Sequence, residues 1–202
     1  MKKIDLPPSQ PIHRLVPPFS WVGHIPFAMW LVKELKPNTF VELGVHTGNS
    51  FFAICQAVQE AELSTRCIGV DTWEGDFHAG VYDDVIWNDV STYTNQNYPT
   101  IVQLIRKKFD DALVDIPDVS IDLLHIDGFH TYEAVKHDFE TWQKKLSDNA
   151  FILFHDIAEY RDDFGVHKFW DEVKVLGDYL EFKHHHGLGV LNIKKSTSQD
   201  KK

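Results

Sequence analysis

The sequence predicts an α/β fold built on a mostly parallel sheet, and three observations favour it. Short apolar runs alternate with helix-like segments between residues 39 and 157, which is typical of parallel strands joined by crossover helices. Two further strand-like runs follow, and the short glycine-containing connection between them predicts an antiparallel hairpin at one sheet edge. A length of 202 residues suits a single domain with a substantial core.

Composition and charge narrow the class of protein. With 43% apolar and 25% charged residues, the chain has the composition of a globular protein. A formal net charge of -10 leaves no basic surplus for phosphates, which excludes a general nucleic-acid binder. The sequence has no apolar window as long as a membrane span, and its start lacks the apolar stretch of a secretory signal. We therefore expect a cytoplasmic protein without a membrane span, with Cys55 and Cys67 as buried thiols.

The chain opens with a proline-rich segment, residues 1–23. Five of the nine prolines lie in the first 20 residues, so we expect an extended arm that packs over the body or over a partner. A helix is predicted next, ending at Pro37, because apolar side chains recur on one face. These are Phe27, Trp30, Leu31 and Leu35. Residues 24–193 form the predicted domain, and residues 194–202 are a polar tail that we expect to be disordered.

Five apolar runs are the predicted parallel strands. They are TFVELGV (39–45), RCIGVDTW (66–73), IVQLIRKKF (101–109), IDLLHID (121–127) and AFILFHDI (150–157). After the fourth run, apolar residues at steps of four, three and four form one buried helical stripe: Val135, Phe139, Trp142 and Leu146. His137 and Asp138 are predicted to lie on the exposed side of that helix. The terminal hairpin pairs YLEFKHHH (179–186) with GVLNI (189–193).

The turn after the first strand has the features of a cofactor loop. The strand carries Glu42 and runs into Gly44 and Gly48, which permit a tight turn, and a helix is predicted to start near Asn49 or Ser50. The free N–H groups of a helix N-terminus suit an anionic group. Asp71 follows 27 residues after Gly44 at the end of the next strand, where a carboxylate is suited to a ribose diol. The glycine spacing departs from G-x-G-x-x-G, which counts against NAD, and a plain structural turn stays the alternative.

Two later strands end in carboxylates and imidazoles. Because ligands bind at the carboxyl ends of parallel strands, we expect Asp127, His130, His155 and Asp156 to converge. Such a group suits a divalent cation with hard oxygen ligands, such as magnesium, manganese or calcium, and His130 could instead act as a base.

Each feature of these strand ends has a structural alternative. A carboxylate such as Asp127 after a strand commonly caps a turn or helix. His125 lies inside its strand, where a buried and hydrogen-bonded core histidine is favoured over a ligand. The run His184–His186 is predicted at the turn of the last hairpin, where simple exposure is favoured over contact with a substrate.

Four segments resemble a known family. FVELGVHTGNS, IGVDTWEGD, LLHIDGFHTYEAVKHDFETW and FILFHDI occur in the order seen in class I S-adenosylmethionine-dependent methyltransferases. The resemblance is greatest to macrocin-type sugar O-methyltransferases and to methyltransferase modules found beside bacterial glycosyltransferases. It covers roughly residues 24 to 193, with HIDGFHTYEAV as its most specific part. The resemblance implies a Rossmann-like sandwich around a seven-stranded sheet whose last strand is antiparallel.

The resemblance also implies roles for individual residues. Glu42, Gly44 and Ser50 would surround the methionine part of S-adenosyl-L-methionine, Asp71 would hold its ribose, and Asp110 would lie near its adenine. Asp127 and Asp156 occupy the positions of magnesium-binding carboxylates. The family pattern has paired acids after the fifth strand, whereas this chain has His155 before Asp156, so the implied ligands of a magnesium or manganese ion are Asp127, His155 and Asp156.

Together these features predict an O-methyltransferase that acts, with assistance from a metal, on a hydroxyl of a sugar or other polyol. Asp127 and His130 are the candidate catalytic residues, and the partner is a small-molecule or glycan substrate. An iron-dependent hydroxylase is an alternative, since His130, His155 and Asp127 could form a facial iron site. A degenerate cofactor-binding module that acts through a partner is another. The sequence leaves a homo-oligomer open.

Overall fold

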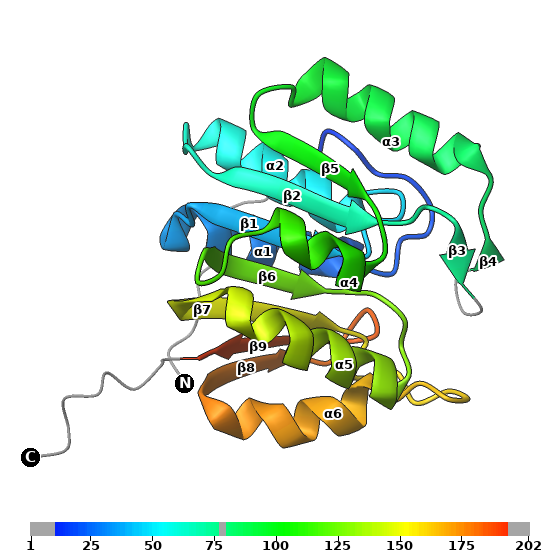
Figure 1. The fold of residues 1–202 in the computed structure, drawn as a ribbon, viewed down its shortest axis with the longest axis vertical. Coiled ribbons are helices and arrows are strands. Elements are labelled where there is room, and N and C mark those ends of the chain that lie inside the picture. Colours follow the sequence, from blue (N-terminus) through cyan, green and yellow to red (C-terminus); the bar gives the residue numbers. More distant parts are fainter. Residues whose placement is uncertain (1–10, 77–79, 194–202) are drawn as a thin grey trace, which may run out of the picture.

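A seven-stranded sheet forms the centre of the protein. The computed structural model describes residues 11–76 and 80–193, and its strands follow the order β5-β2-β1-β6-β7-β9-β8 (Figure 1). The strands are β1 (Thr39–Leu43), β2 (Arg66–Asp71), β5 (Val102–Arg106), β6 (Ile121–Ile126), β7 (Leu146–His155), β8 (Asp178–Phe182) and β9 (Leu188–Asn192). All neighbours from β5 to β7 pair in parallel, which confirms the predicted sheet type.

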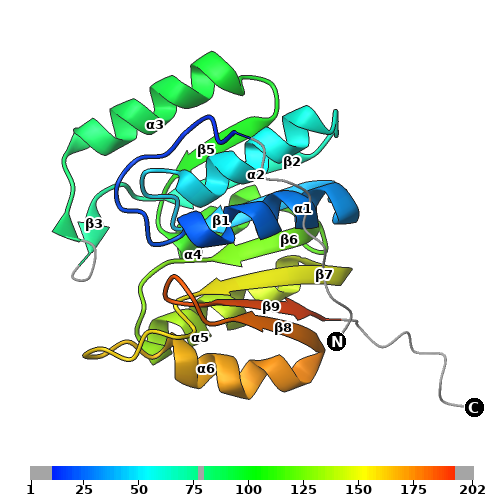
Figure 2. The same ribbon diagram turned by 180° about the vertical axis from the view of Figure 1, so that it is seen from behind.

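Helices cover both faces of the sheet. One face carries α1 (Ile25–Leu35), α2 (Asn49–Glu60) and α3 (Asp84–Asn97), as Figure 2 shows. The other carries α4 (Phe109–Ala112), α5 (Tyr132–Trp142) and α6 (Val166–Val173). Short 3-10 helices are η1 (Val22–His24), η2 (Leu113–Asp115), η3 (Gln143–Lys145) and η4 (Lys174–Leu176), and a small antiparallel pair joins β3 (Gly75–Asp76) to β4 (Gly80–Val81). Within residues 11–76 and 80–193, we find no helix with the length and apolar character needed to cross a bilayer.

The central strands are buried on both faces, which explains their continuous apolar runs. In β1, Phe40 packs with the cluster under α1 and α2, whereas the next residue, Val41, packs with the cluster under α5 and α6. Successive side chains of a strand point to opposite faces, so one short run supplies both layers. Cys55 and Cys67 are both buried free thiols, as predicted.

The last strand runs against the rest of the sheet. β9 lies between β7 and β8 and is antiparallel to both, with Leu153 opposite Val190 and Leu180 opposite the same residue. This arrangement confirms the predicted hairpin and the antiparallel last strand. The hairpin turn, which contains His184–His186, is thereby held beside the carboxyl end of β7.

The N-terminal arm was predicted over residues 1–23, and its described part begins at residue 11. Residues 11–21 contain no helix or strand and pass along the face that carries α2 and α3 (Figure 2). Trp21 at the end of this stretch is buried in the core beneath α1. Residues 1–10 and the predicted tail, residues 194–202, lie outside the described residues.

One predicted exposure is wrong. His137 is on the surface, but Asp138 is only 7% exposed. Asp138 lies three residues after Val135 and four before Trp142, both members of the buried stripe of α5. Helical spacing therefore turns its carboxylate toward the body of the protein.

Candidate active site

A cavity of about 620 Å³ opens at the carboxyl ends of the parallel strands. Its walls come from the turn after β1, from the residues after β2, β6 and β7, and from Pro18, Ser20 and Trp21 of the arm. In open α/β sheets this edge is where ligands bind, because the loops that cross it can vary without disturbing the sheet. The position and size of the cavity suit a nucleoside cofactor together with a small acceptor.

The turn from β1 into α2 lies against the backbone that follows β6, where Asp127 lines the cavity. Gly44 has φ 92°, and a Cβ atom on it would lie 2.0 Å from the carbonyl oxygen of Asp127. Gly48 has φ 85° and precedes Asn49, the first residue of α2. Glycine is required at Gly44 for both its left-handed backbone and the contact with β6, and the N-terminus of α2 faces the cavity at Asn49 and Ser50.

Asp71 lines the same cavity from the end of β2. Its Oδ2 accepts a hydrogen bond from the His46 backbone N–H at 2.8 Å, and its Oδ1 accepts one from the Trp73 backbone N–H at 2.7 Å. Burial raises the pKa of Asp71, although these N–H donors oppose the rise. Each carboxylate oxygen retains a lone pair, so Asp71 fixes the loop and can still accept hydrogen bonds from a diol.

Glu42 lies behind the cavity wall rather than in it. The side chain is fully buried, and Oε1 accepts a 2.6 Å hydrogen bond from the Ser50 hydroxyl, which itself lines the cavity. His125 Nδ1 lies 3.1 Å from Glu42 Oε2, and His125 Nε2 accepts a 3.2 Å hydrogen bond from Trp21 Nε1. Burial raises the pKa of Glu42. His125 is thus the partnered core histidine that the sequence favours, and Glu42 reaches the cavity through Ser50.

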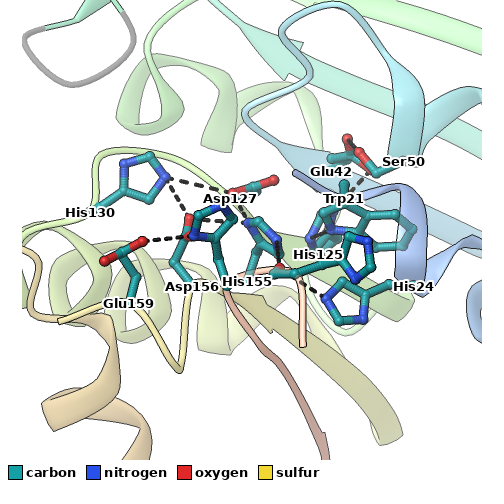
Figure 3. Close-up of polar contacts among 12 residues, drawn as sticks. Trp21, His24, Glu42, Ser50, His125, Asp127, His130, His155, Asp156 and Glu159 are labelled. Carbon is teal, nitrogen blue, oxygen red and sulfur yellow. Dashed lines mark hydrogen bonds and ion pairs between the residues drawn. The ribbon is translucent and has the colours of Figure 1, made fainter. Parts of the chain in front are cut away.

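The four residues predicted to converge after β6 and β7 do so. Figure 3 shows Asp127, His130, His155 and Asp156 facing one another. Nε2 of His130 lies 2.9 Å from Asp156 Oδ2 and 3.7 Å from Asp127 Oδ1. Nδ1 of His155 lies 3.0 Å from Asp156 Oδ2 and 3.3 Å from Asp127 Oδ1, while its Nε2 lies 3.2 Å from the His185 carbonyl oxygen.

The charges of these four residues compensate one another. Burial opposes ionisation of the two carboxyls, but the imidazoles outweigh it and lower the pKa of Asp156 to about 2 and that of Asp127 well below its ordinary value. Burial likewise opposes protonation of His130, yet the two carboxylates raise its pKa to about 10, and they raise the pKa of His155 as well. The two carboxylates thus favour protonation of the two imidazoles that face them, and this pairing makes the burial of all four side chains tolerable.

The same residues fit a divalent cation. Among the described residues, Asp127, His130 and Asp156 bring one ligand atom each within 4.8 Å of one another. Asp156 has φ 61°, a left-handed conformation that is strained for a residue with a side chain and that is found at ligand sites. In contrast, His155 is not part of this group, and its Nε2 faces the His185 carbonyl oxygen. His130 is therefore better placed than His155 to complete a ligand set with the two carboxylates.

Asp110 is not brought to the cavity. Its carboxylate pairs with Nε2 of His137 at 2.9 Å, and both side chains are more than half exposed. Its neighbours Lys108 and Phe109 line the cavity instead. Because α4 begins at Phe109, consecutive residues here point in different directions, and of these described residues only Lys108 and Phe109 reach the cavity. The sequence around Asp110 contains no pattern that distinguishes these residues from it.

Further cavity residues are Arg161 and Phe164, which the sequence did not single out, and His186, for which simple exposure was favoured over contact with a substrate. Arg161 and Phe164 follow β7, and Phe164 stacks on His130 with ring centroids 4.9 Å apart. His186 reaches the cavity from the hairpin turn. These residues approach the site through tertiary contacts between distant segments, so the local sequence pattern had no signal for Arg161 or Phe164, and for His186 only its place at the hairpin turn.

The sheet order, the antiparallel last strand and the cavity define the class: this is a Rossmann-like methyltransferase fold. A family model described as "Methyltransferase domain" matches residues 41–157, which is more than half of the chain. The chain belongs to this family.

The chain is also similar in sequence to parts of two longer proteins. The chain is 47% identical over 191 residues to uncharacterized protein y4gI of Sinorhizobium fredii, covering 95% of this chain and 21% of that protein. It is 30% identical over 131 residues to uncharacterized protein R132 of Acanthamoeba polyphaga mimivirus, covering 63% of this chain and 55% of that protein. The chain thus spans about a fifth of the length of y4gI and about half of the length of R132.

The fold is shared with a putative caffeoyl-CoA O-methyltransferase from Staphylococcus aureus, with a TM-score of 0.66, 12% identity, and coverage of 90% of this chain and 86% of that one. It is also shared with the O-methyltransferase TomG from Streptomyces achromogenes, solved in complex with SAM, with a TM-score of 0.63, 12% identity, and coverage of 90% and 82%.

Proposed function

We propose that this methyltransferase transfers the methyl group of S-adenosylmethionine to a hydroxyl of a sugar or other polyol. The observation that carries the proposal is one cavity with two chemically different ends. One end is lined by the turn at Gly44, by Ser50 and by Asp71. At the other end, Asp127 lies beside His130 and Asp156. O-Methyltransferases solved with SAM or SAH share the fold, which supports the assignment of the cofactor and of oxygen as the acceptor atom.

The first end of the cavity suits the cofactor. Asp71, already fixed by two backbone N–H groups, can accept hydrogen bonds from the ribose hydroxyls. The N-terminus of α2 and the hydroxyl of Ser50, held by Glu42, face the methionine part. Bound S-adenosylmethionine would supply a methyl group activated by its sulfonium, ready for in-line displacement by an oxygen.

The second end suits an acceptor hydroxyl. Asp127 can accept a hydrogen bond from a neighbouring hydroxyl of the polyol and so orient the reacting one, and His130 holds Asp127 and Asp156 in position from the other side. Positioning the hydroxyl against the methyl group supplies much of the acceleration of such a displacement, since it replaces a bimolecular encounter. A magnesium or manganese ion held by Asp127, His130 and Asp156 would favour ionisation of the hydroxyl. No observation favours the alternative iron site, since the group of described residues whose ligand atoms lie close enough to share an ion is Asp127, His130 and Asp156, without His155.

Transfer of tritium from methyl-labelled S-adenosylmethionine to a panel of methyl glycosides tests the proposal, with magnesium and with EDTA. Asp127→Asn should lower turnover on the best glycoside about 100-fold or more, because the variant lacks the anionic acceptor that orients the hydroxyl. Glu140→Gln, on the exposed side of α5, is the matched control and should keep wild-type turnover. Equal turnover by Asp127→Asn and wild type would contradict the proposed role of Asp127.

A further inference from the structure

We propose that His186, oriented by Glu159 at the hairpin turn beside the cavity, is the general base that takes the proton of the acceptor hydroxyl. The inference rests on the proposed methyl transfer and assigns a residue to its proton-transfer step. His186 lines the cavity from the turn between β8 and β9, and Glu159 comes from the loop after β7. The pair lies beside Asp156, as the position of Glu159 in Figure 3 indicates.

Glu159 is held so that one oxygen is left for the histidine. Its Oε1 accepts hydrogen bonds from the backbone N–H groups of Tyr160 at 3.0 Å and Arg161 at 3.2 Å, and Arg161 Nε lies 3.0 Å from the same oxygen. Its Oε2 lies 2.7 Å from Nδ1 of His186. Burial opposes ionisation of Glu159, but the hydrogen bonds from Arg161 and His186 outweigh it and lower its pKa to about 2.

The carboxylate fixes the tautomer of the histidine. An ionised carboxylate only accepts hydrogen bonds, so Nδ1 of His186 must carry the proton that it donates to Glu159. In the neutral ring, Nε2 then holds the lone pair. Within the described residues, this nitrogen has no hydrogen-bond partner, so it is free to accept a proton.

The backbone of the turn is built to present this ring. His185 and His186 have φ 47° and 64°, a left-handed conformation that costs free energy in residues with side chains. The carbonyl oxygen of His186 accepts a 2.7 Å hydrogen bond from the Ala158 N–H, and a Cβ on Gly187 would lie 2.7 Å from that same nitrogen. The hairpin is therefore locked onto the loop that carries Glu159. Strained backbone held in place by its surroundings is typical of functional sites.

Two other imidazoles of the cavity are less suited to this step. Nε2 of His130 faces two carboxylates, with Asp156 Oδ2 at 2.9 Å and Asp127 Oδ1 at 3.7 Å. His155 presents both nitrogens to oxygen acceptors. These nitrogens already face protein oxygens, whereas Nε2 of His186 faces no hydrogen-bond partner among the described residues.

The step balances as a single displacement. A lone pair of the acceptor oxygen forms the O–C bond to the methyl carbon, and the C–S bond breaks with its electrons returning to sulfur, which becomes a neutral thioether. The O–H proton passes to Nε2 of His186. The imidazolium so formed is stabilised by the Glu159 carboxylate, as in other carboxylate–imidazole pairs that act as bases.

Three variants test this assignment by methyl transfer to the best methyl glycoside and by calorimetry with S-adenosylhomocysteine. His186→Asn keeps a side-chain N–H for Glu159 but has no base, so kcat should fall about 100-fold or more while the affinity for S-adenosylhomocysteine stays within about twofold. Glu159→Gln, which alters the positioning residue, should lower kcat less. His184→Asn, on the same turn but outside the cavity lining, should retain wild-type turnover. The kcat of His186→Asn should rise in proportion to the hydroxide concentration as pH increases, whereas the kcat of wild type should reach a plateau.

Long-range proton–nitrogen spectra of histidine rings supply a readout that needs no acceptor. The ring signals of His186 are those that are missing from the spectrum of His186→Asn. At pH 8 they should show a protonated Nδ1 and an unprotonated Nε2. A doubly protonated ring, or a proton on Nε2 alone, would overturn the assignment, and so would turnover by His186→Asn above one third of wild type. If wild type fails to bind S-adenosylhomocysteine, the proposed function fails instead, whatever the ring spectrum shows.

Discussion

At the scale of single residues, Gly44 joins the two ends of the cavity. Its missing Cβ lets the turn after β1 approach the carbonyl oxygen of Asp127, so this turn and the cluster of Asp127, His130 and Asp156 share a fixed separation. Asp127 in turn donates its backbone N–H to the Leu43 carbonyl at 2.9 Å. The two ends of the site are thus positioned by backbone, which is more rigid than side chains.

Gly44→Ala should destabilise the protein by more than about 3 kcal/mol, because it adds a steric clash to the cost of a left-handed backbone. Gly80→Ala is the matched control: its φ of 87° is similar, but its Cβ would meet nothing within 4 Å. The control should cost only about 1–2 kcal/mol. Urea unfolding measures both, and equal losses would show that the contact with Asp127 is unimportant.

Residue identities predicted part of the site and missed another part. Asp127, His130, His155 and Asp156 could be assigned because each follows a recognisable buried strand, and parallel strands end at one edge. The burial of Asp138 could also have been found, since its spacing from Val135 and Trp142 matches the buried stripe. The Glu159–His186 pair had no such signal, because 27 residues separate the partners and the contact depends on how a hairpin folds back.

At the scale of elements, the arm is held to the N-terminus of α2 by side-chain hydrogen bonds. Asn49, the first residue of α2, accepts from the Val16 N–H at 2.9 Å and donates to the carbonyl oxygens of Val16 and Pro18 at 2.6 and 2.8 Å. Arg14 forms an ion pair with Asp89. The sequence predicted an extended arm from its prolines, but its path depends on these contacts with α2 and α3.

Asn49→Ala should release this part of the arm. Loss of three hydrogen bonds at a buried residue corresponds to about 2 kcal/mol, enough to raise the open population about 30-fold. Hydrogen exchange over residues 12–21 should accelerate accordingly, and S-adenosylhomocysteine should bind more weakly because the arm lines the cavity. Asn88→Ala, exposed on α3, is the control. Unchanged exchange in Asn49→Ala would exclude this anchoring.

At the scale of the whole molecule, one buried carboxyl links stability to pH. Burial raises the pKa of Asp138 to about 7, with Asp110 adding to the rise and His137 opposing it. Between the unfolded value near 3.8 and the folded value, the folded protein keeps a proton that the unfolded chain has released. The free energy of unfolding therefore falls as pH rises through this window.

Asp138→Asn should remove this decrease in the free energy of unfolding with rising pH. The variant should be more stable than wild type by about 2–4 kcal/mol at pH 8, and the difference should vanish below about pH 3, where both states of wild type are protonated. Thermal unfolding across pH measures the difference. Asp171→Asn, whose side chain is 68% exposed, should show no such trend. A constant difference at all pH values would mean that packing, not ionisation, distinguishes the variant.

The most direct measurement of the central claim is calorimetric titration with S-adenosylhomocysteine. The arrangement of Gly44, Ser50 and Asp71 around the cavity predicts one site per chain with a micromolar Kd, and binding at least about tenfold weaker in a folded Asp71→Ala variant. No binding by wild type at about 1 mM ligand, or equal affinity in the variant, would contradict the account.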